Sequence, residues 1–381
     1  AIRYAVTRTL SAWTSCLKSR SLDVALALSS ATLPTCRGID SEDHSSDESE
    51  PKSLSQRERI LRISAVIRRA ELRLRRRYPI LDQQDLLGAV IFIASATGFL
   101  ISSILYLQGI LPAWACVLLN AMFASLLHEL EHDLIHNLYF RTRPLVQHFL
   151  MLGVWIFRGN TINPWYRRHL HLLHHRESGR DTDLEERLLG NGLRYGIRRC
   201  FTTLDAFVGS LLRWKELTQI PACKPGGLLR AGFPLMVMFC VCWYAWLLLH
   251  GLSWTHSWFG TSWIPPVWLS SVTTMLNTVV VIYVLPNVIR QGCLNFISST
   301  MHYYGDVGDT IEQTQVLNAW YFWPFQLFCF NFGSTHGIHH FVVSQPFYLR
   351  QMVARPAHRV MRRYGVRFND LGTFARANRR G

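Results

Sequence analysis

The chain has 381 residues, of which 49% are hydrophobic, and it carries a formal net charge of +15 at pH 7. Its apolar residues are gathered into long runs, which argues against a soluble globular protein and predicts an integral membrane protein. The cysteines are scattered and include no C-x-x-C pair, which argues against a disulfide framework and a zinc ribbon. A basic excess can indicate nucleic-acid binding. Because membrane spans are expected, it is predicted instead to reflect membrane topology, with Lys and Arg on the cytoplasmic side.

Residues 1–56 are predicted to form a disordered or targeting-like N-terminal tail. Residues 1–38 are basic and rich in Ser and Thr, which fits a transit peptide, a disordered tail or natively untranslated upstream sequence equally well. Residues 39–56 are an acidic linker with nothing to bury. Residues 57–79 then alternate Arg with Leu, Ile and Val, which predicts a basic amphipathic helix beside the membrane.

Four apolar runs are long enough, or nearly so, to cross a hydrocarbon core of roughly 30 Å. They are expected to pair into two hairpins, which are formed by residues 86–107 with 111–127 and by residues 235–249 with 267–288. Residues 145–157 are apolar but too short to cross, so they are predicted to be interfacial or buried.

The last span is expected to end or kink at Pro286, with His302 one to four turns further on. The predicted fold class is an all-α integral membrane protein with about four transmembrane helices and a cytoplasmic helical cap. Residues 80–350 are expected to form this membrane domain, and residues 351–381 a basic cytoplasmic tail.

Histidines are concentrated in three clusters and at one further position. His128, His132 and His136 recur at a spacing of four, so a helix would place them on one face. The remaining candidate metal ligands are His171, His174, His175, His302, His336, His339 and His340. An even number of spans places all of them on the Arg-rich side. Neutral imidazole suits iron, zinc and copper, and this many imidazoles would suffice for two metal ions.

These clusters resemble the histidine boxes of the membrane fatty-acid desaturase and hydroxylase superfamily. The likeness covers roughly residues 80–350 and is carried by HDLIH (132–136), HLLHH (171–175) and HGIHH (336–340). HYYG (302–305) is similar to the ligand between the last span and the third box, notably in the alkane-hydroxylase branch. His128 and His169 are extra to the plain pattern, and whether His128 is a ligand stays open at this point.

The resemblance implies two Fe ions held by the boxes, with O2 as co-substrate and electrons from a separate reductase system. It implies a membrane lipid or acyl-CoA as substrate, and a ferredoxin or a cytochrome b5-type protein as electron donor. It places the chain in a bacterial inner membrane or the endoplasmic reticulum. Carboxylates near the boxes could orient the imidazoles, and the candidates are Glu129, Glu131, Asp133, Asp181 and Asp183.

Three other functions compete with a fatty-acyl desaturase. A fatty-acid hydroxylase or alkane monooxygenase of the same superfamily would use the same ligands. HELEH (128–132) is also a literal H-E-x-x-H, the signature of a zinc metalloprotease. A membrane protein that stores or transports metal through its His clusters is the third alternative. The desaturase is preferred, because a protease would leave most of the clustered histidines unexplained.

Overall fold

The computed structural model describes residues 54–261 and 265–381, so the predicted N-terminal tail lies outside the described residues up to position 53. Within the described ranges the regular structure is helical and contains no β-strand. The first helices are α3 (Gln56–Arg77), η1 (Pro79–Asp82), α4 (Gln84–Leu107), α5 (Ala113–Ile135), α6 (Pro144–Phe157) and α7 (Pro164–Glu177).

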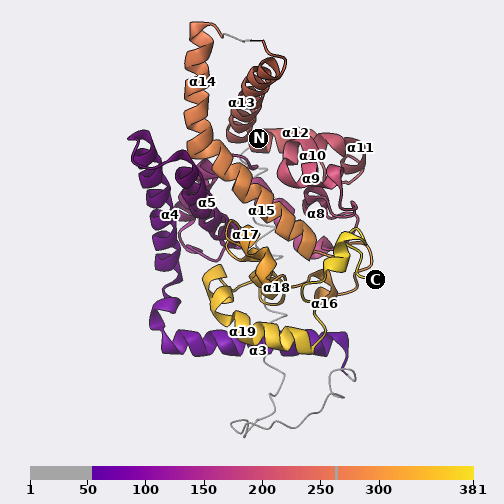
Figure 1. The fold of residues 1–381 in the computed structure, drawn as a ribbon. Coiled ribbons are helices and arrows are strands. Elements are labelled where there is room, and N and C mark those ends of the chain that lie inside the picture. Colours follow the sequence, from indigo (N-terminus) through magenta and orange to yellow (C-terminus); the bar gives the residue numbers. More distant parts are fainter. Residues whose placement is uncertain (1–53, 262–264) are drawn as a thin grey trace, which may run out of the picture. The chain divides into compact units, whose positions relative to one another are not determined.

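Short helices then lead to a second long pair (Figure 1). The short helices are α8 (Leu184–Leu189), α9 (Ile197–Leu204), α10 (Ala206–Leu212), α11 (Trp214–Leu217) and α12 (Pro225–Gly232). The long pair comprises α13 (Leu235–Trp258), α14 (Val267–Val279), the π-helical segment η2 (Val280–Val284) and α15 (Leu285–Met301). The C-terminal part holds α16 (Thr310–Gln313), η3 (Trp320–Phe322), α17 (Trp323–Gln326), α18 (Phe332–Phe341), α19 (Phe347–Arg363) and η4 (Leu371–Phe374).

Four helical stretches are long and apolar enough to cross a membrane, namely α4, α5, α13 and the continuous stretch Val267–Met301. α4 packs against α5, and α13 packs against α14, so the stretches form two hairpins (Figure 1). α13 leaves apolar side chains such as Met238, Val241 and Leu248 exposed, as expected for a helix that faces lipid. The predicted all-α fold with four candidate transmembrane helices is confirmed.

The second span continues two turns beyond its predicted end at residue 127, to Ile135. The sequence indicates an earlier end because charged residues follow, but these residues are buried and paired. Glu131 accepts hydrogen bonds from Arg158 and Arg167, and Asp133 accepts one from Arg350. Ion pairing of this kind removes the reason for a helix to end where its apolar run ends.

The last span does not end near Pro286, because the helix continues through this residue to Met301. Pro286 lacks a backbone N–H, and the π-helical segment η2 immediately precedes α15 and accommodates that loss. The Asn120 side chain of α5 donates a hydrogen bond of 2.8 Å to the Ile282 carbonyl within this segment. His302 therefore follows directly on the helix rather than one to four turns later.

α3 and α19 lie side by side across one end of the α4 and α5 hairpin (Figure 1). Ser55 and Glu58 form a capping box that starts α3. The two helices share an apolar core that includes Ile63 and Ile67 of α3 and Val353 of α19. This core positions α18, because the Ser64 hydroxyl of α3 donates a hydrogen bond to the carbonyl of Phe341, the last residue of α18.

Candidate metal centre

The first histidine cluster lies at the C-terminal end of α5, where every residue from 127 to 135 is buried. His132 and His136 are one turn apart, and their ring centroids are separated by 5.1 Å. His128 lies one turn earlier and is also buried, with its ring 6.1 Å from the ring of Phe332.

The second cluster occupies the last turns of α7. This helix begins at Pro164, and the Asn163 side chain caps it by accepting a hydrogen bond of 2.9 Å from the backbone N–H of Tyr166. The candidate ligands on it are His171, His174 and His175. His169, which is extra to the family pattern, is on the exposed side of the same helix.

The third cluster is on α18, which contributes His336, His339 and His340. His302 approaches from the C-terminal end of α15, where its Nδ1 lies 2.8 Å from the Ser298 carbonyl and donates to it. Four helices from different parts of the sequence thus direct imidazoles toward one region between the spans and the pair formed by α3 and α19.

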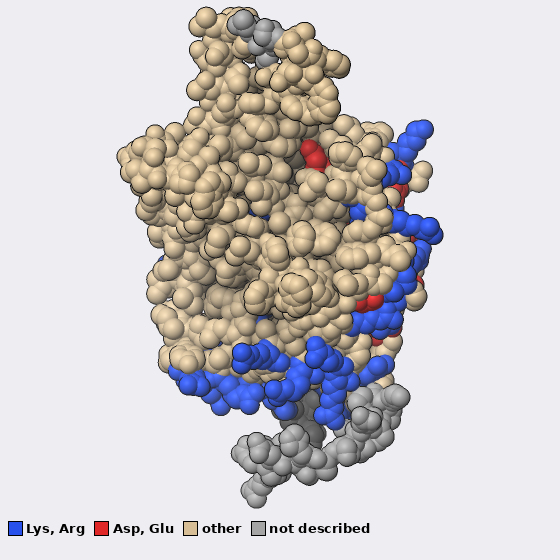
Figure 2. All heavy atoms as spheres, viewed as in Figure 1, with Lys and Arg blue, Asp and Glu red and all other residues tan. Residues whose placement is uncertain are grey.

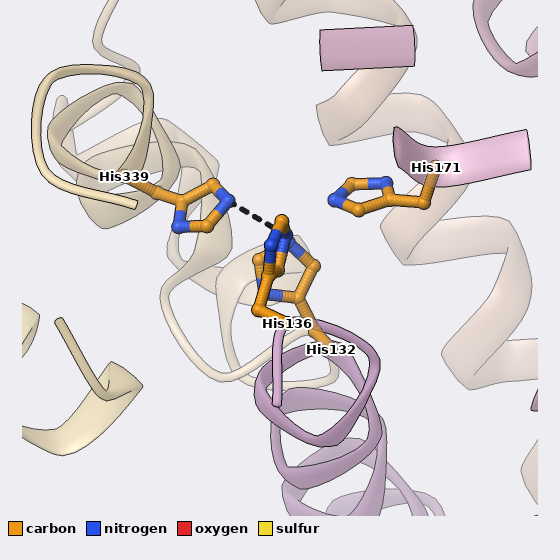
Figure 3. Close-up of side chains that lie close together, drawn as sticks. All are labelled: His132, His136, His171 and His339. Atoms are coloured by element: carbon orange, nitrogen blue, oxygen red, sulfur yellow. Dashed lines mark hydrogen bonds between the residues drawn. The ribbon is translucent and has the colours of Figure 1, made fainter. Parts of the chain in front are cut away.

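The imidazoles separate into two groups. The first histidine group comprises His132, His136, His171 and His339, and His175 joins it by direct contact. The Nε2 atom of His339 lies 3.1 Å from that of His136 and 3.0 Å from that of His175. Figure 3 shows His132 and His136 rising from α5 between His171 and His339.

The second histidine group comprises His174, His302, His336 and His340. The Nε2 atoms of His336 and His340 are 3.2 Å apart. The ring of His302 is 5.2 Å from that of His174 and 5.3 Å from that of His336, measured between centroids. His128 belongs to neither group, so all the predicted ligands except His128 are brought together.

The spacing of the ring nitrogens fits a shared metal ion. With a metal–nitrogen distance of roughly 2.1 Å, two ligands at right angles lie about 3.0 Å apart, which is the separation seen in the first group. Both ring nitrogens of His132 and the Nε2 of His302 are buried without a hydrogen-bond partner among the described residues. A bound metal would satisfy such atoms, and all-imidazole donor sets suit iron, zinc or copper.

Electrostatics keep most of these rings neutral, which is the form that binds a metal. Burial lowers the pKa of His136 to about 2, and burial with the nearby His174 charge lowers the pKa of His302 to about 4. His174 is the exception. Its burial acts to lower its pKa, but the Asp183 carboxylate outweighs this effect and raises the pKa to about 10.

Hydrogen bonds to the second ring nitrogen orient several ligands. The Nδ1 of His171 donates to the Glu185 carboxylate at 3.0 Å, and the Nδ1 of His174 donates to Asp183 at 2.8 Å. In both residues this bond leaves Nε2 to face the metal position, with the tautomer assigned from the hydrogen-bond network. Asp183 thereby takes the orienting role predicted for it.

The other predicted carboxylates contact different partners. Asp181 accepts a hydrogen bond from the hydroxyl of Tyr304, while Glu131 binds arginines. Arg350 of α19 lies between Glu129, at 3.5 Å, and Asp133, at 2.9 Å. Glu129, Glu131 and Asp133 therefore hold neighbouring elements around α5, and Asp181 binds the segment after α15; none of them forms a hydrogen bond to an imidazole within the described ranges.

Three supporting residues are not apparent from the sequence. Glu185 is separated from His171 by 14 positions, and no spacing rule connects them. The His302 carbonyl accepts hydrogen bonds from Asn378, at 3.0 Å, and from Asn191, at 3.4 Å. Asn378 is buried, so the segment predicted as a basic tail contributes directly to the support of His302.

Four candidate spans and two buried histidine groups define this chain as a multi-pass membrane protein with histidine-rich metal sites. A family model described as fatty acid desaturase matches residues 108–372. This match covers more than half of the chain, so the protein belongs to the fatty acid desaturase family, and the predicted resemblance is confirmed. Membership implies oxidoreductase activity on an acyl substrate. A comparison with curated proteins returned no match.

Proposed function

We propose that this protein is a membrane-bound di-iron fatty-acyl desaturase that inserts a double bond into an acyl chain, using O2 and two electrons. The observation that supports this proposal is the separation of the histidines into two groups whose ring nitrogens approach to about 3 Å, as ligands of one ion do. One iron would be held by His132, His136, His171, His175 and His339, and the other by His174, His302, His336 and His340. His128 lies outside both sets.

When bound, the two irons would supply the activation of O2 that removal of hydrogen from unactivated C–H bonds requires. The chain's own residues provide the setting for that chemistry. Asp183 and Glu185 hold the tautomers of His174 and His171. Burial of both groups excludes bulk water, which protects a reactive site from side reactions.

The proposed electron donor is a separate ferredoxin or cytochrome b5-type protein, and the proposed substrate is a membrane lipid or acyl-CoA. Exposed arginines of α3 and α19 gather at the end of the described body away from the tips of α13 and α14 (Figure 2). Such a surface attracts acidic partners over long range, and positive charge favours the cytoplasmic side. We therefore place the boxes on the cytoplasmic side of a bacterial inner membrane or the endoplasmic reticulum.

A hydroxylase or alkane monooxygenase is the second candidate. It shares the ligand set, and HYYG (302–305) is the feature that favours it. The outcome depends on where the C–H bond lies relative to the irons. The zinc-protease alternative has less support. It requires His128 and His132 to bind one ion beside a catalytic Glu129, whereas His128 is in neither group and Glu129 lies against Arg350.

The test is expression in a host with a simple lipid profile, followed by mass spectrometry of the host's fatty acids. A new double bond that disappears in His339→Ala supports the desaturase. A hydroxylated product assigns the hydroxylase instead, and an unchanged profile with O2 and a donor present contradicts both.

Metal analysis of the purified protein provides a second, independent measurement. The proposal expects about two irons per chain, as two histidine groups require. A single zinc accompanied by peptidase activity would establish the protease, and metal uptake without O2 consumption would establish a storage or transport protein.

A further inference from the structure

A groove with a volume of about 230 Å³ lies between α3 and α19, near the C-terminal end of α3. Four apolar side chains and two arginines line it, namely Leu74, Met352, Val353, Pro356, Arg73 and Arg77. Both arginines and Met352 are exposed, so the groove is open to the surroundings of the protein and a ligand can enter it.

The two arginines of the groove lie one turn apart on α3, and no acid neutralises them. The acids nearest to them in the sequence, Glu71 and Asp82, both pair with Arg75, at 2.8 Å and 3.4 Å. In the part of the chain that the structure describes, neither Arg73 nor Arg77 has a carboxylate partner. Neighbouring guanidinium groups suit a phosphate, because they form charge-assisted and often bidentate hydrogen bonds with its oxygens.

The groove lies beside the start of the first candidate membrane span. Arg77 ends α3, η1 follows, and α4 begins at Gln84. The Nη1 of Arg75 donates to the Leu81 carbonyl at 2.5 Å and thereby attaches the end of α3 to η1. Because α3 runs across the end of the α4 and α5 hairpin (Figure 1), we expect it to follow the membrane surface at the level of the lipid head groups.

Apolar surface continues from this span toward the groove. On α4, the exposed side chains of Leu86, Val90 and Ile93 recur at helical spacing, as expected for a side that faces lipid. Tyr78 and Ile80 are also exposed, and they lie between the end of α3 and the start of α4. A tyrosine at this position is typical of the boundary between lipid and water. A lipid packed against α4 would therefore have its head group close to the arginines of the groove.

The size of the groove favours a lipid head group over a protein as its occupant. Drug-sized ligands occupy pockets of roughly 300–1,000 Å³, so about 230 Å³ admits a head group and the beginning of an acyl chain. A stable protein interface covers about 800 Å² on each partner. An acidic protein would therefore use the exposed arginines all along α3 and α19, and the two in the groove would have no special importance.

We propose that the groove between α3 and α19 binds an anionic phospholipid of the surrounding membrane. Arg73 and Arg77 hold the phosphate, while Leu74 and Met352 contact the glycerol backbone and the beginning of an acyl chain. This lipid belongs to the leaflet beside the start of α4 and is separate from the acyl substrate of the histidine groups. The inference therefore does not depend on the proposed desaturase reaction.

Val353 connects the groove to the support of the metal centre. It lines the groove, and it is also buried in the core of α3 and α19, which includes Ile338 and Phe341 of α18. The third histidine cluster is on α18. A phospholipid that contacts both α3 and α19 would stabilise this core, and binding to the folded protein alone raises the unfolding temperature.

The experiment measures binding of three probes to the purified full-length protein in an uncharged detergent. The probes are dioctanoyl phosphatidylglycerol, dioctanoyl phosphatidylcholine and glycerol 3-phosphate. The wild type is expected to bind phosphatidylglycerol at least about tenfold more tightly than phosphatidylcholine, whose choline cation offsets the phosphate charge. Glycerol 3-phosphate should bind more weakly than phosphatidylglycerol, because it lacks the acyl chains that contact the apolar lining.

Combining Arg73→Gln with Arg77→Gln should weaken phosphatidylglycerol binding about 25-fold, at about fivefold for each arginine. Replacing both arginines by Lys keeps the charge and should retain part of the affinity. Arg68→Gln combined with Arg69→Gln is the matched control, because it removes two exposed arginines of the same helix that do not line the groove. This control should bind the probes like the wild type, and thermal unfolding verifies that each variant is folded.

Equal affinity of the wild type for the two phospholipids overturns the inference. Equal losses in the two glutamine double variants also overturn it, because they would indicate diffuse attraction without a site. Glycerol 3-phosphate bound as tightly as phosphatidylglycerol would assign the groove to a soluble phosphate compound instead. Unchanged phosphatidylglycerol binding in the variant of Arg73 and Arg77, with loss of binding to an acidic plant-type ferredoxin, would assign it to a protein partner. Binding is read without turnover, so failure here is separate from failure of the proposed desaturase.

Discussion

The orientation of several imidazoles depends on a contact at the second ring nitrogen, as in His171, His174 and His302. Asp183 illustrates this dependence, because it accepts the Nδ1 hydrogen of His174 at 2.8 Å and also caps α8 by accepting from the Glu186 backbone. One carboxylate thus both stabilises the start of α8 and sets the direction in which the Nε2 of His174 points. Residues that support ligands in this way influence metal affinity without touching the metal.

Asp183→Asn is therefore expected to weaken metal binding at the second histidine group by about 10–100-fold. The amide keeps the size of the side chain but removes the charge that fixes the His174 tautomer. Competition against a metal chelator measures the loss. Asp181→Asn is the matched control, because this acid of the same loop binds the Tyr304 hydroxyl instead. Equal losses in the two variants would contradict the orienting role.

His128 and His136 are both one turn from His132, yet only His136 lies in a histidine group. His136→Ala is expected to lose about half or more of the bound iron, because one of two sites is lost. His128→Ala should keep its iron at the wild-type level. Metal analysis of the two purified variants decides whether His136 or His128 binds metal together with His132. A larger loss of iron in His128→Ala than in His136→Ala would assign His128 as the ligand.

At the scale of helices, buried ion pairs fix the position of one helix relative to another more specifically than apolar packing alone does. Arg350 of α19 is buried and binds Asp133 and Glu129 on α5, and Asp133 also accepts a hydrogen bond of 2.8 Å from the Phe347 backbone. The start of α19 is thereby attached beside His132. Removing one partner of such a buried set leaves uncompensated charge, so the connection is sensitive to substitution.

Arg350→Ala is expected to destabilise the protein by about 3–5 kcal/mol, because two carboxylates lose their buried partner. The midpoint of thermal unfolding in detergent measures this change. Arg355→Ala, on the exposed side of the same helix, should leave the midpoint nearly unchanged. If both variants behaved alike, the stabilising role of the Arg350 pairs would be refuted.

For the whole molecule, assembling so many imidazoles in a buried region makes stability depend on protons and on metal. Unfolded imidazoles take up protons near pH 6.5, whereas burial holds the folded pKa of His302 at about 4 and that of His136 at about 2. Protonation of the unfolded chain therefore lowers stability as the pH falls below about 6.5. His174, with its pKa raised to about 10, contributes in the opposite direction, and its stabilisation is lost as the pH rises through that value.

The metal-free protein is accordingly expected to unfold at a clearly lower temperature at pH 5 than at pH 7.5. Bound iron should reduce this difference until protons displace it from the imidazoles. Thermal unfolding across this range, with and without metal, is the measurement. A midpoint that does not change with pH in the metal-free protein would show that the histidines are not buried neutral.

Properties that depend on neighbouring residues could be predicted from the sequence. Apolar runs identified the four candidate spans, because membrane thickness imposes a length on each of them. The spacing of His132 and His136, and the repeated HxxHH pattern, predicted histidines that the structure gathers into two groups, because these positions share one side of a helix. The family match over residues 108–372 agrees with the resemblance that the histidine clusters indicated.

Only the tertiary structure decided how the histidines divide and where the buried charges are paired. His136 and His339 are separated by 203 positions, yet their Nε2 atoms lie 3.1 Å apart. The end of α5 stays helical because Arg158, Arg167 and Arg350 come from distant segments to neutralise its acids. Spacing along one helix cannot distinguish His128 from His136, because both are one turn from His132. The distinction depends on the level along α5 at which the histidines of α7 and α18 approach, and packing between helices determines that level: His128, one turn earlier, meets Phe332 instead.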